Sequence, residues 1–223
     1  MPEGVTFAFR SEASRFMTTR SPQPFLSYRI VWWLLFGVGI GPFLWLARAV
    51  IQNSLGPDPA EALMHTTGAW AIRFLVVVLL ARPLSQWGWP VLFRTRRLFG
   101  LFVAFYASLH LLVFAQVYVG WSGAILAEEL TERPYVVVGF VAWLLLLPLS
   151  ITSLHSLRRR MGRHWRSLHR SVYLIALLAT LHVLWLSRSD VGDALLYALA
   201  FGTLLGWRFV VFWRKSLRAK QSS

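Results

Sequence analysis

The stretch that decides the fold is His169–Trp185, HRSVYLIALLATLHVLW, an apolar run with one histidine at its basic edge and another deep inside. Together with its flanks it forms one of six apolar blocks, each about twenty residues long, which is the length of helix that crosses a hydrocarbon core of roughly 30 Å. The blocks are residues 30–51, 69–89, 98–119, 135–155, 168–187 and 194–213. Because the runs are continuous and do not alternate, they predict helices and exclude a β-barrel. The sequence therefore predicts an all-α fold, an integral membrane bundle of six transmembrane helices.

The composition supports a membrane protein and excludes several kinds of site. Of the 223 residues, 57% are hydrophobic, against roughly 45–50% in soluble domains. The chain has no cysteine, which excludes disulfides, thiolate metal sites and covalently attached c-type heme. A net charge of +14 suggests nucleic acid in a soluble protein, but here the charges lie between apolar blocks and no nucleic-acid motif is present. We expect no nucleic-acid partner.

The distribution of charge predicts the orientation. One set of connections and both chain ends hold 19 of the 23 basic residues, whereas the opposite loops hold seven of the nine acids. Basic residues concentrate in cytoplasmic loops, so both termini are predicted to be cytoplasmic, in the inner membrane of a bacterium. The predicted parts are a tail at 1–29, a transmembrane domain at 30–213 and a tail at 214–223. The basic face would also attract anionic membrane lipid or cofactor phosphates.

Two histidines are predicted to reach similar depths in different helices. At 1.5 Å per residue, His110 lies about 18 Å along its predicted helix and His182 about 20 Å along another. A polar side chain inside a membrane usually faces a partner or a cavity. One interpretation is a neutral histidine hydrogen-bonded across a helix interface. Zinc would require a third or fourth ligand nearby, whereas two imidazoles suffice as axial ligands of heme b, which we favour.

Three further histidines lie toward the basic side. His169 is about 20 Å from His182 along the helix, so one cofactor cannot use both. With His155 and His164 it could support an inner redox site, either heme or flavin. Alternatively, His155 and His164 could be interfacial polar residues of a basic loop. His65 is expected in an outer loop without a special role.

Arg73 is the one charge well inside the second predicted helix, which enters from outside, so Arg73 is expected less than two turns below the outer membrane surface. It could extend toward the interface, as long cationic side chains often do. Alternatively, it could pair with a propionate of the outer heme.

Several motifs carry a resemblance to a known family. The segments HTTG, RTRRLFGL, YASLHLLVFA, ELTERPYVVVGFVAW and LHRSVYLIALLATLHVLW resemble the MsrQ (YedZ) family, over about His65 to Trp185. These are heme-b membrane subunits of a periplasmic methionine sulfoxide reductase system. The resemblance implies a ferric-reductase-like transmembrane core, in which the heme-associated, metal-ligating histidines fall on His110, His169 and His182.

The resemblance also implies partners and cofactors. The electron acceptor would be a periplasmic MsrP-like molybdopterin reductase that repairs oxidised proteins, and the donor would be quinol or a cytoplasmic flavin reductase. One heme b is expected, and a second is left open because Arg96 stands where larger relatives carry another histidine. FMN binding is described for the family, but no motif here places it.

Three functions follow from these observations. The first is an electron-transfer subunit of an oxidoreductase complex, distinct from the substrate-reducing subunit. The second, a stand-alone ferric or metal reductase, is disfavoured because no nucleotide-binding domain follows the last helix and no GxGxxG occurs. The third, a non-redox transporter, would predict acids or broken helices at the membrane midplane.

Overall fold

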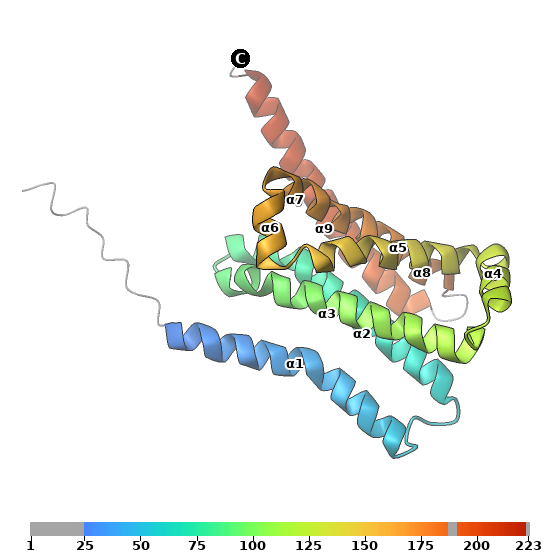
Figure 1. The fold of residues 1–223 in the computed structure, drawn as a ribbon. Helices are drawn as coiled ribbons and strands as arrows, with labels where there is room; N and C mark the ends of the chain where they lie inside the picture. The colour runs from blue at the N-terminus through green and yellow to red at the C-terminus, as the bar shows by residue number, and fades with distance from the viewer. Residues whose placement is uncertain (1–24, 187–190, 222–223) are drawn as a thin grey trace, which may run out of the picture. The chain divides into compact units, whose positions relative to one another are not determined.

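The computed structural model describes residues 25–186 and 191–221, and in these residues the chain forms helices and no strand (Figure 1). The chain divides into two compact units, residues 1–38 and 39–223. The described part of the first unit is the beginning of helix α1 (Phe25–Ile51), which continues into the second unit. Most of the predicted N-terminal tail, 1–29, lies outside the described residues.

Six helices in the described residues are long and apolar enough to cross a membrane, which confirms the predicted fold class. Besides α1 the spans lie in α2 (Pro59–Gln86), in α3 (Pro90–Phe114) with its continuation to Val119, in α5 (Pro134–Ile151), in α8 (Val172–Leu186) with the helical turns before it from Arg163, and in α9 (Val191–Gln221). Helix α3 continues as a π-helix, Ala115–Val119, and α8 follows directly on a short 3-10 turn, His169–Ser171. The shorter helices are α4 (Gly123–Glu132), α6 (His155–Met161) and α7 (Arg163–Leu168).

Helix α2 begins ten residues earlier than the apolar block predicted. Asp58 is its N-cap, and the carboxylate accepts a hydrogen bond of 2.9 Å from the backbone N–H of Glu61. Pro59 occupies the first helical position, where its missing N–H costs no hydrogen bond. His65 therefore lies within α2, exposed, and the prediction that it belongs to a loop was wrong. At the other end of the chain, α9 runs through Gln221, so most of the predicted tail 214–223 is helical.

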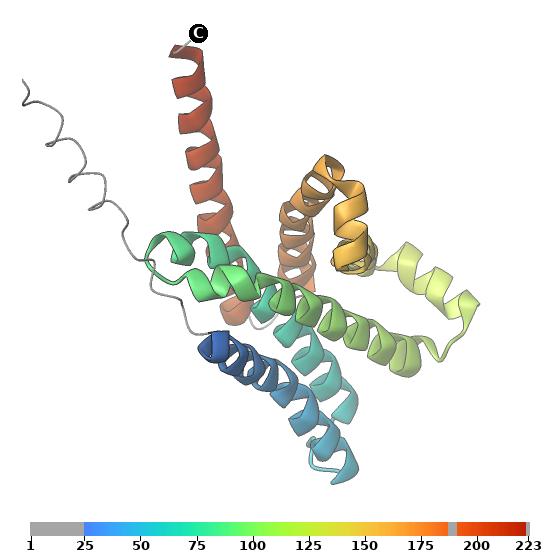
Figure 2. The same cartoon turned by 60° about the vertical axis from the view of Figure 1, so that its left-hand side comes forward.

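The second unit is built from two helix pairs. α2 packs along α3, and α5 packs along α8, while α9 contacts both α8 and α2 (Figures 1 and 2). The interface of the first pair is aromatic, with Phe74 stacked on Phe99 and Phe102 and close to the ring of buried Tyr106. Many large apolar side chains are exposed on the outer faces of the helices, as expected where lipid replaces water.

Two interruptions in the helices are repaired by side chains from other helices. Pro83 has no N–H, so it leaves the carbonyl of Leu79 without its helical partner; Arg208 of α9 donates to that carbonyl through Nη2, at 2.9 Å. The second repair lies in α1, where the hydroxyl of Tyr106 accepts from the N–H of Phe43 (3.0 Å) and donates to the carbonyl of Gly39 (2.8 Å). Both repairs tie neighbouring helices together through satisfied backbone groups.

Candidate functional site

His110 and His182 lie opposite each other, as their predicted depths suggested. His110 comes from the last turn of α3 and His182 from the last turns of α8, so the two helix pairs of the second unit each supply one ring. The ring centroids are 6.3 Å apart and the ring planes are nearly perpendicular, at 86°. Both side chains are half-buried.

The ring of His110 is held by helix α2. Its Nδ1 lies 3.0 Å from the carbonyl oxygen of Met64. Because a carbonyl only accepts, Nδ1 carries the proton. The hydroxyl of Thr67 is 3.4 Å from the same nitrogen but donates to the carbonyl of Leu63 at 2.7 Å. A Cβ built on Gly68 would lie 3.2 Å from the ring, so this glycine permits the close approach.

The ring of His182 is held by helix α5 in the same way. Its Nδ1–H donates to the carbonyl of Tyr135 at 2.7 Å. A Cβ built on Gly139 would lie 2.8 Å from two atoms of the ring, closer than real Cβ atoms approach. In both pairs the accepting carbonyl stands four residues before the glycine, one helical turn away. The two helix pairs therefore hold their histidine rings in the same way, with one backbone carbonyl and one glycine.

This arrangement determines which atoms of the two imidazoles can bind a metal. A neutral imidazole protonated at Nδ1 carries a free lone pair at Nε2, and a hydrogen bond from Nδ1–H to a carbonyl is typical of metal-ligating histidines. Neither Nε2 has a hydrogen-bond partner among the residues that the structure describes.

The separation of the rings fits one shared metal ion. A metal–imidazole bond is about 2.1 Å long and a ring nitrogen lies about 1.1 Å from its ring centroid, so two imidazoles on opposite sides of one ion have centroids roughly 6.4 Å apart. The observed value is 6.3 Å. Within residues 25–186 and 191–221, no group of three or more histidine, cysteine or acidic side chains could hold a metal. The pair therefore suits a metal that needs only two protein ligands, as heme iron does.

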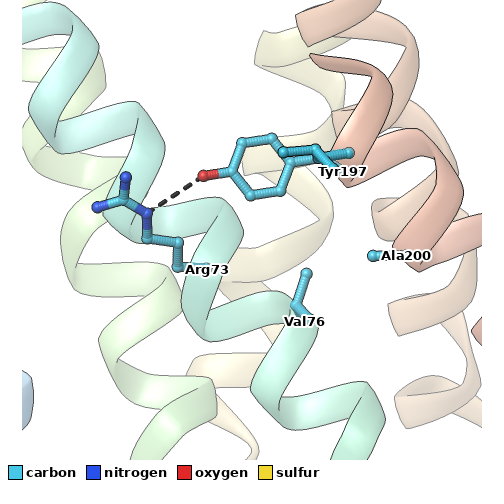
Figure 3. A pocket seen from close by; sticks show the side chains of 5 residues that line it. Arg73, Val76, Tyr197 and Ala200 are labelled. Atoms are coloured by element: carbon cyan, nitrogen blue, oxygen red, sulfur yellow. Dashed lines mark hydrogen bonds between the residues drawn. The ribbon is translucent and has the colours of Figure 1, made fainter. Parts of the chain in front are cut away.

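Arg73 lies beside a groove between α2 and α9. Its Nε–H donates to the hydroxyl of Tyr197 at 3.2 Å (Figure 3). Its guanidinium lies 5.0 Å from the ring centroid of Trp70. The groove has a volume of about 270 Å³ and is otherwise lined by Val76, Leu196 and Ala200. Because α2 begins at Pro59, Arg73 is fourteen residues from the start of the helix. The predicted block would place it four residues from the start, and its depth below the membrane surface stays a prediction.

His169 belongs to a separate cluster at the basic end of the bundle. Its ring stacks on Trp165, with centroids 4.0 Å apart, and its Nδ1–H donates to the backbone carbonyl of that residue at 3.2 Å. The guanidinium of Arg158 lies 4.8 Å from the ring centroid of Trp165, and Arg96 is near enough to interact electrostatically with His169. His169 is half-buried in this cluster.

The other two predicted histidines are not assembled into the inner site. His155 begins α6 and His164 lies in α7, and both side chains are exposed. Within the part of the chain that the structure describes, no contact joins either of them to His169.

Sequence reasoning missed the groups that hold the two rings. The accepting atoms are backbone carbonyls of Met64 and Tyr135, which any residue type provides. Gly68 and Gly139 did carry a signal, because small residues in membrane helices mark close packing. The tyrosine that binds Arg73 is more than a hundred residues away along the chain, and no local pattern connects the two.

Comparison with known proteins gives one family and many close relatives. Residues 67–180 match the family described as ferric reductase like transmembrane component. The chain is 45% identical over 165 residues to the "Protein-methionine-sulfoxide reductase heme-binding subunit MsrQ" of Xanthomonas euvesicatoria pv. vesicatoria, covering 74% of each chain. It is 46% identical over 170 residues to the protein of the same name from Xanthomonas campestris pv. campestris, covering 76% of this chain and 78% of the relative. No solved structure gives a significant match.

Proposed function

Because the chain belongs to the MsrQ family of heme-binding subunits, within the ferric reductase-like transmembrane proteins, we propose that it binds heme b between His110 and His182 and passes electrons to a methionine sulfoxide reductase. The chain is a multi-pass protein of a bacterial inner membrane. The observation that carries the proposal is the pair of neighbouring rings, with both Nδ1–H groups bound to backbone carbonyls and neither Nε2 bonded to any residue that the structure describes.

The donor set suits electron transfer. A heme held by His110 and His182 would supply a one-electron iron centre, which suits electron transfer rather than oxygen or substrate chemistry. The chain would hold the centre rigidly, since each imidazole is fixed by a hydrogen bond and by a glycine contact. Rigid ligands change little between oxidation states, which favours rapid electron exchange.

The charge distribution supports a direction for the electrons. Acids of the described residues lie at the end formed by the starts of α2 and α9 and by α4, and the arginine-rich helices α6 and α7 lie at the other end (Figure 1). By the positive-inside rule the arginine-rich end faces the cytoplasm. We assign the donor, quinol or a flavin reductase, to the membrane or that basic side. The periplasmic, MsrP-like molybdopterin reductase would dock at the acidic end.

The cluster around His169 is the proposed entry region for electrons. The Nε2 of His169 has no hydrogen-bond partner in the described part of the chain. Together with the stacked Trp165 and the guanidinium groups of Arg96 and Arg158, it suits an aromatic redox group that carries carboxylates or phosphates. A second heme, with its carboxylates, and FMN, with its phosphate, are both groups of this kind. His155 and His164, exposed in the same basic segment, are the remaining candidates for contacts to that group.

Arg73 is the proposed partner of a heme propionate. Only its Nε–H is engaged, by Tyr197, and both terminal nitrogens lack a hydrogen-bond partner within the described residues. A side chain on α2 is directed toward the start of the helix, and the start of α2 is the end where Met64 and Gly68 hold His110. The guanidinium is thus directed toward the level of the histidine pair.

The test is a heme count combined with ligand substitution. A pyridine hemochrome assay on the purified wild-type chain should give at least one b-type heme, and His110→Ala and His182→Ala should each abolish the low-spin Soret signal of that heme. A full and unshifted spectrum in both variants would reject the assignment. A stand-alone metal reductase would reduce soluble ferric chelates at full rate without the reductase subunit, and a transporter would show no visible absorbance.

A further inference from the structure

A pocket opens at the acidic end of the bundle, where α4 gives way to α5 and where α8 ends. It has a volume of about 370 Å³ and is lined by Glu132, Arg133, Pro134, Tyr135, Trp185 and Leu186. All six residues lie in the second unit, and the side chains of Trp185 and Leu186 are half exposed, at 51% and 55%. The pocket is therefore accessible to a molecule that approaches this end of the bundle.

The wall of this pocket contacts the candidate iron ligand directly. Tyr135 accepts the hydrogen bond from Nδ1–H of His182 at 2.7 Å, and the two ring centroids are 6.3 Å apart. Trp185 follows His182 by three residues on α8, almost one turn. A side chain of a partner seated in the pocket would lie against Tyr135 and Trp185. Tyr135 would then be the one residue between that side chain and the imidazole of His182. Because electron transfer weakens steeply with distance, this is a short exit route from the histidine pair.

The end of the bundle that carries the pocket is acidic in the described residues. Glu132 lies in the lining, and Glu128 and Asp193 are exposed at the same end. The one basic lining residue, Arg133, is already paired with Glu129 at 3.1 Å, and that carboxylate raises the pKa of Arg133, so the two charges largely cancel. Glu132 is therefore the unpaired charge of the described lining, and with the exposed acids Glu128 and Asp193 at the same end it would attract a positively charged surface.

We infer that this pocket is the electron-exit site, where the soluble reductase subunit docks through a basic surface patch and seats one side chain against Tyr135 and Trp185. This inference rests on the proposed function, since it presupposes a heme on His182. The other candidate occupant is lipid, because tryptophans often lie at membrane interfaces. The acids at this end argue against lipid, since Glu132 in the lining and the exposed Glu128 and Asp193 repel the anionic headgroups of a bacterial membrane.

The experiment measures how fast the reduced full-length, heme-loaded chain is reoxidised. The acceptors are the purified MsrP-like reductase and, separately, a small neutral oxidant. Glu132→Lys and Trp185→Ala are the pocket variants, and Glu61→Lys is the matched control, because Glu61 is an exposed acid at the same end that does not line the pocket. We expect both pocket variants to slow reoxidation by the reductase roughly tenfold or more, while the Soret band and the reaction with the small oxidant stay unchanged. The wild-type rate should also fall as salt is raised.

The outcomes separate the two proposals. If the pocket variants react with the reductase as fast as Glu61→Lys does, the docking site is rejected while the heme assignment stands. If Trp185→Ala alters only retention of lipid by the purified protein, the pocket is a lipid contact and the inference is likewise wrong. If the wild-type chain carries no low-spin heme, the proposed function fails before the docking question arises.

Discussion

The ring of His182 lies so close to Gly139 that a Cβ on the glycine would stand 2.8 Å from Cε1 and Nδ1 of the imidazole. Gly139→Ala should therefore push the ring off its hydrogen bond with Tyr135. Changes to groups that orient a metal ligand commonly cost about 10–100-fold in affinity, and we expect heme affinity to fall within that range. Heme titration of the apoprotein measures it.

Gly68→Ala should have the same effect to a smaller extent, because the corresponding distance to His110 is 3.2 Å. Gly100→Ala is the control on helix α3, since a Cβ there meets nothing within 4 Å. Equal heme affinity in all three variants would show that the glycines do not position the rings.

The nearly perpendicular imidazole planes predict a spectroscopic signature. Parallel axial rings split two of the iron d orbitals and give a rhombic low-spin signal, whereas perpendicular rings leave these orbitals almost degenerate. With planes at 86°, the ferric protein should give a strongly anisotropic low-spin signal in electron paramagnetic resonance. A rhombic spectrum would show that the rings turn when heme binds.

The bond from Arg208 to the carbonyl of Leu79 predicts a stability coupling with Pro83. Arg208→Met leaves a carbonyl unsatisfied inside the membrane span, which should lower the free energy of unfolding by about 1–3 kcal/mol. In the Pro83→Ala background the new N–H can bond to Leu79, so the same substitution should cost less. Unfolding in detergent of both single variants and the double variant measures the coupling. Purely additive effects would contradict the explanation.

Arg73→Leu removes a positive charge near the proposed propionate. A positive charge stabilises the reduced heme, so its removal should lower the midpoint potential. For one charge partly screened by its surroundings, the fall should be on the order of 50 mV. Tyr197→Phe keeps the charge and removes only the hydrogen bond to Nε, so its shift should be smaller. Potentiometric titration compares the two, and an unchanged potential in Arg73→Leu would place the guanidinium away from the heme.

His169→Ala should slow reduction of the heme by the physiological donor and leave reoxidation by an external acceptor largely intact. The reason is that His169 belongs to the cluster at the basic end, where electrons are proposed to enter. Rapid mixing on oriented vesicles measures both half-reactions, with His65→Ala as the control for loss of an exposed imidazole at the other end. Slower reoxidation alone would reverse the proposed direction.

The sequence by itself determined the membrane class, the six spans and the two histidines at matching depth, because hydropathy and helical rise are local, periodic properties. It also contained the true start of α2, since Asp58, Pro59 and Glu61 form an N-terminal capping pattern, which hydropathy alone does not detect. The block predicted from hydropathy therefore places Arg73 too close to the start of its helix.

Only the tertiary structure decided how the histidines are held. The groups that fix the rings are carbonyls of Met64 and Tyr135, which carry no sequence signal, and they act only because the helices pack at Gly68 and Gly139. The hydrogen bond from Arg208 to the carbonyl of Leu79 joins residues 129 positions apart. Such contacts depend on which helices pack together, and hydropathy cannot specify this because lipid and neighbouring helices are equally apolar.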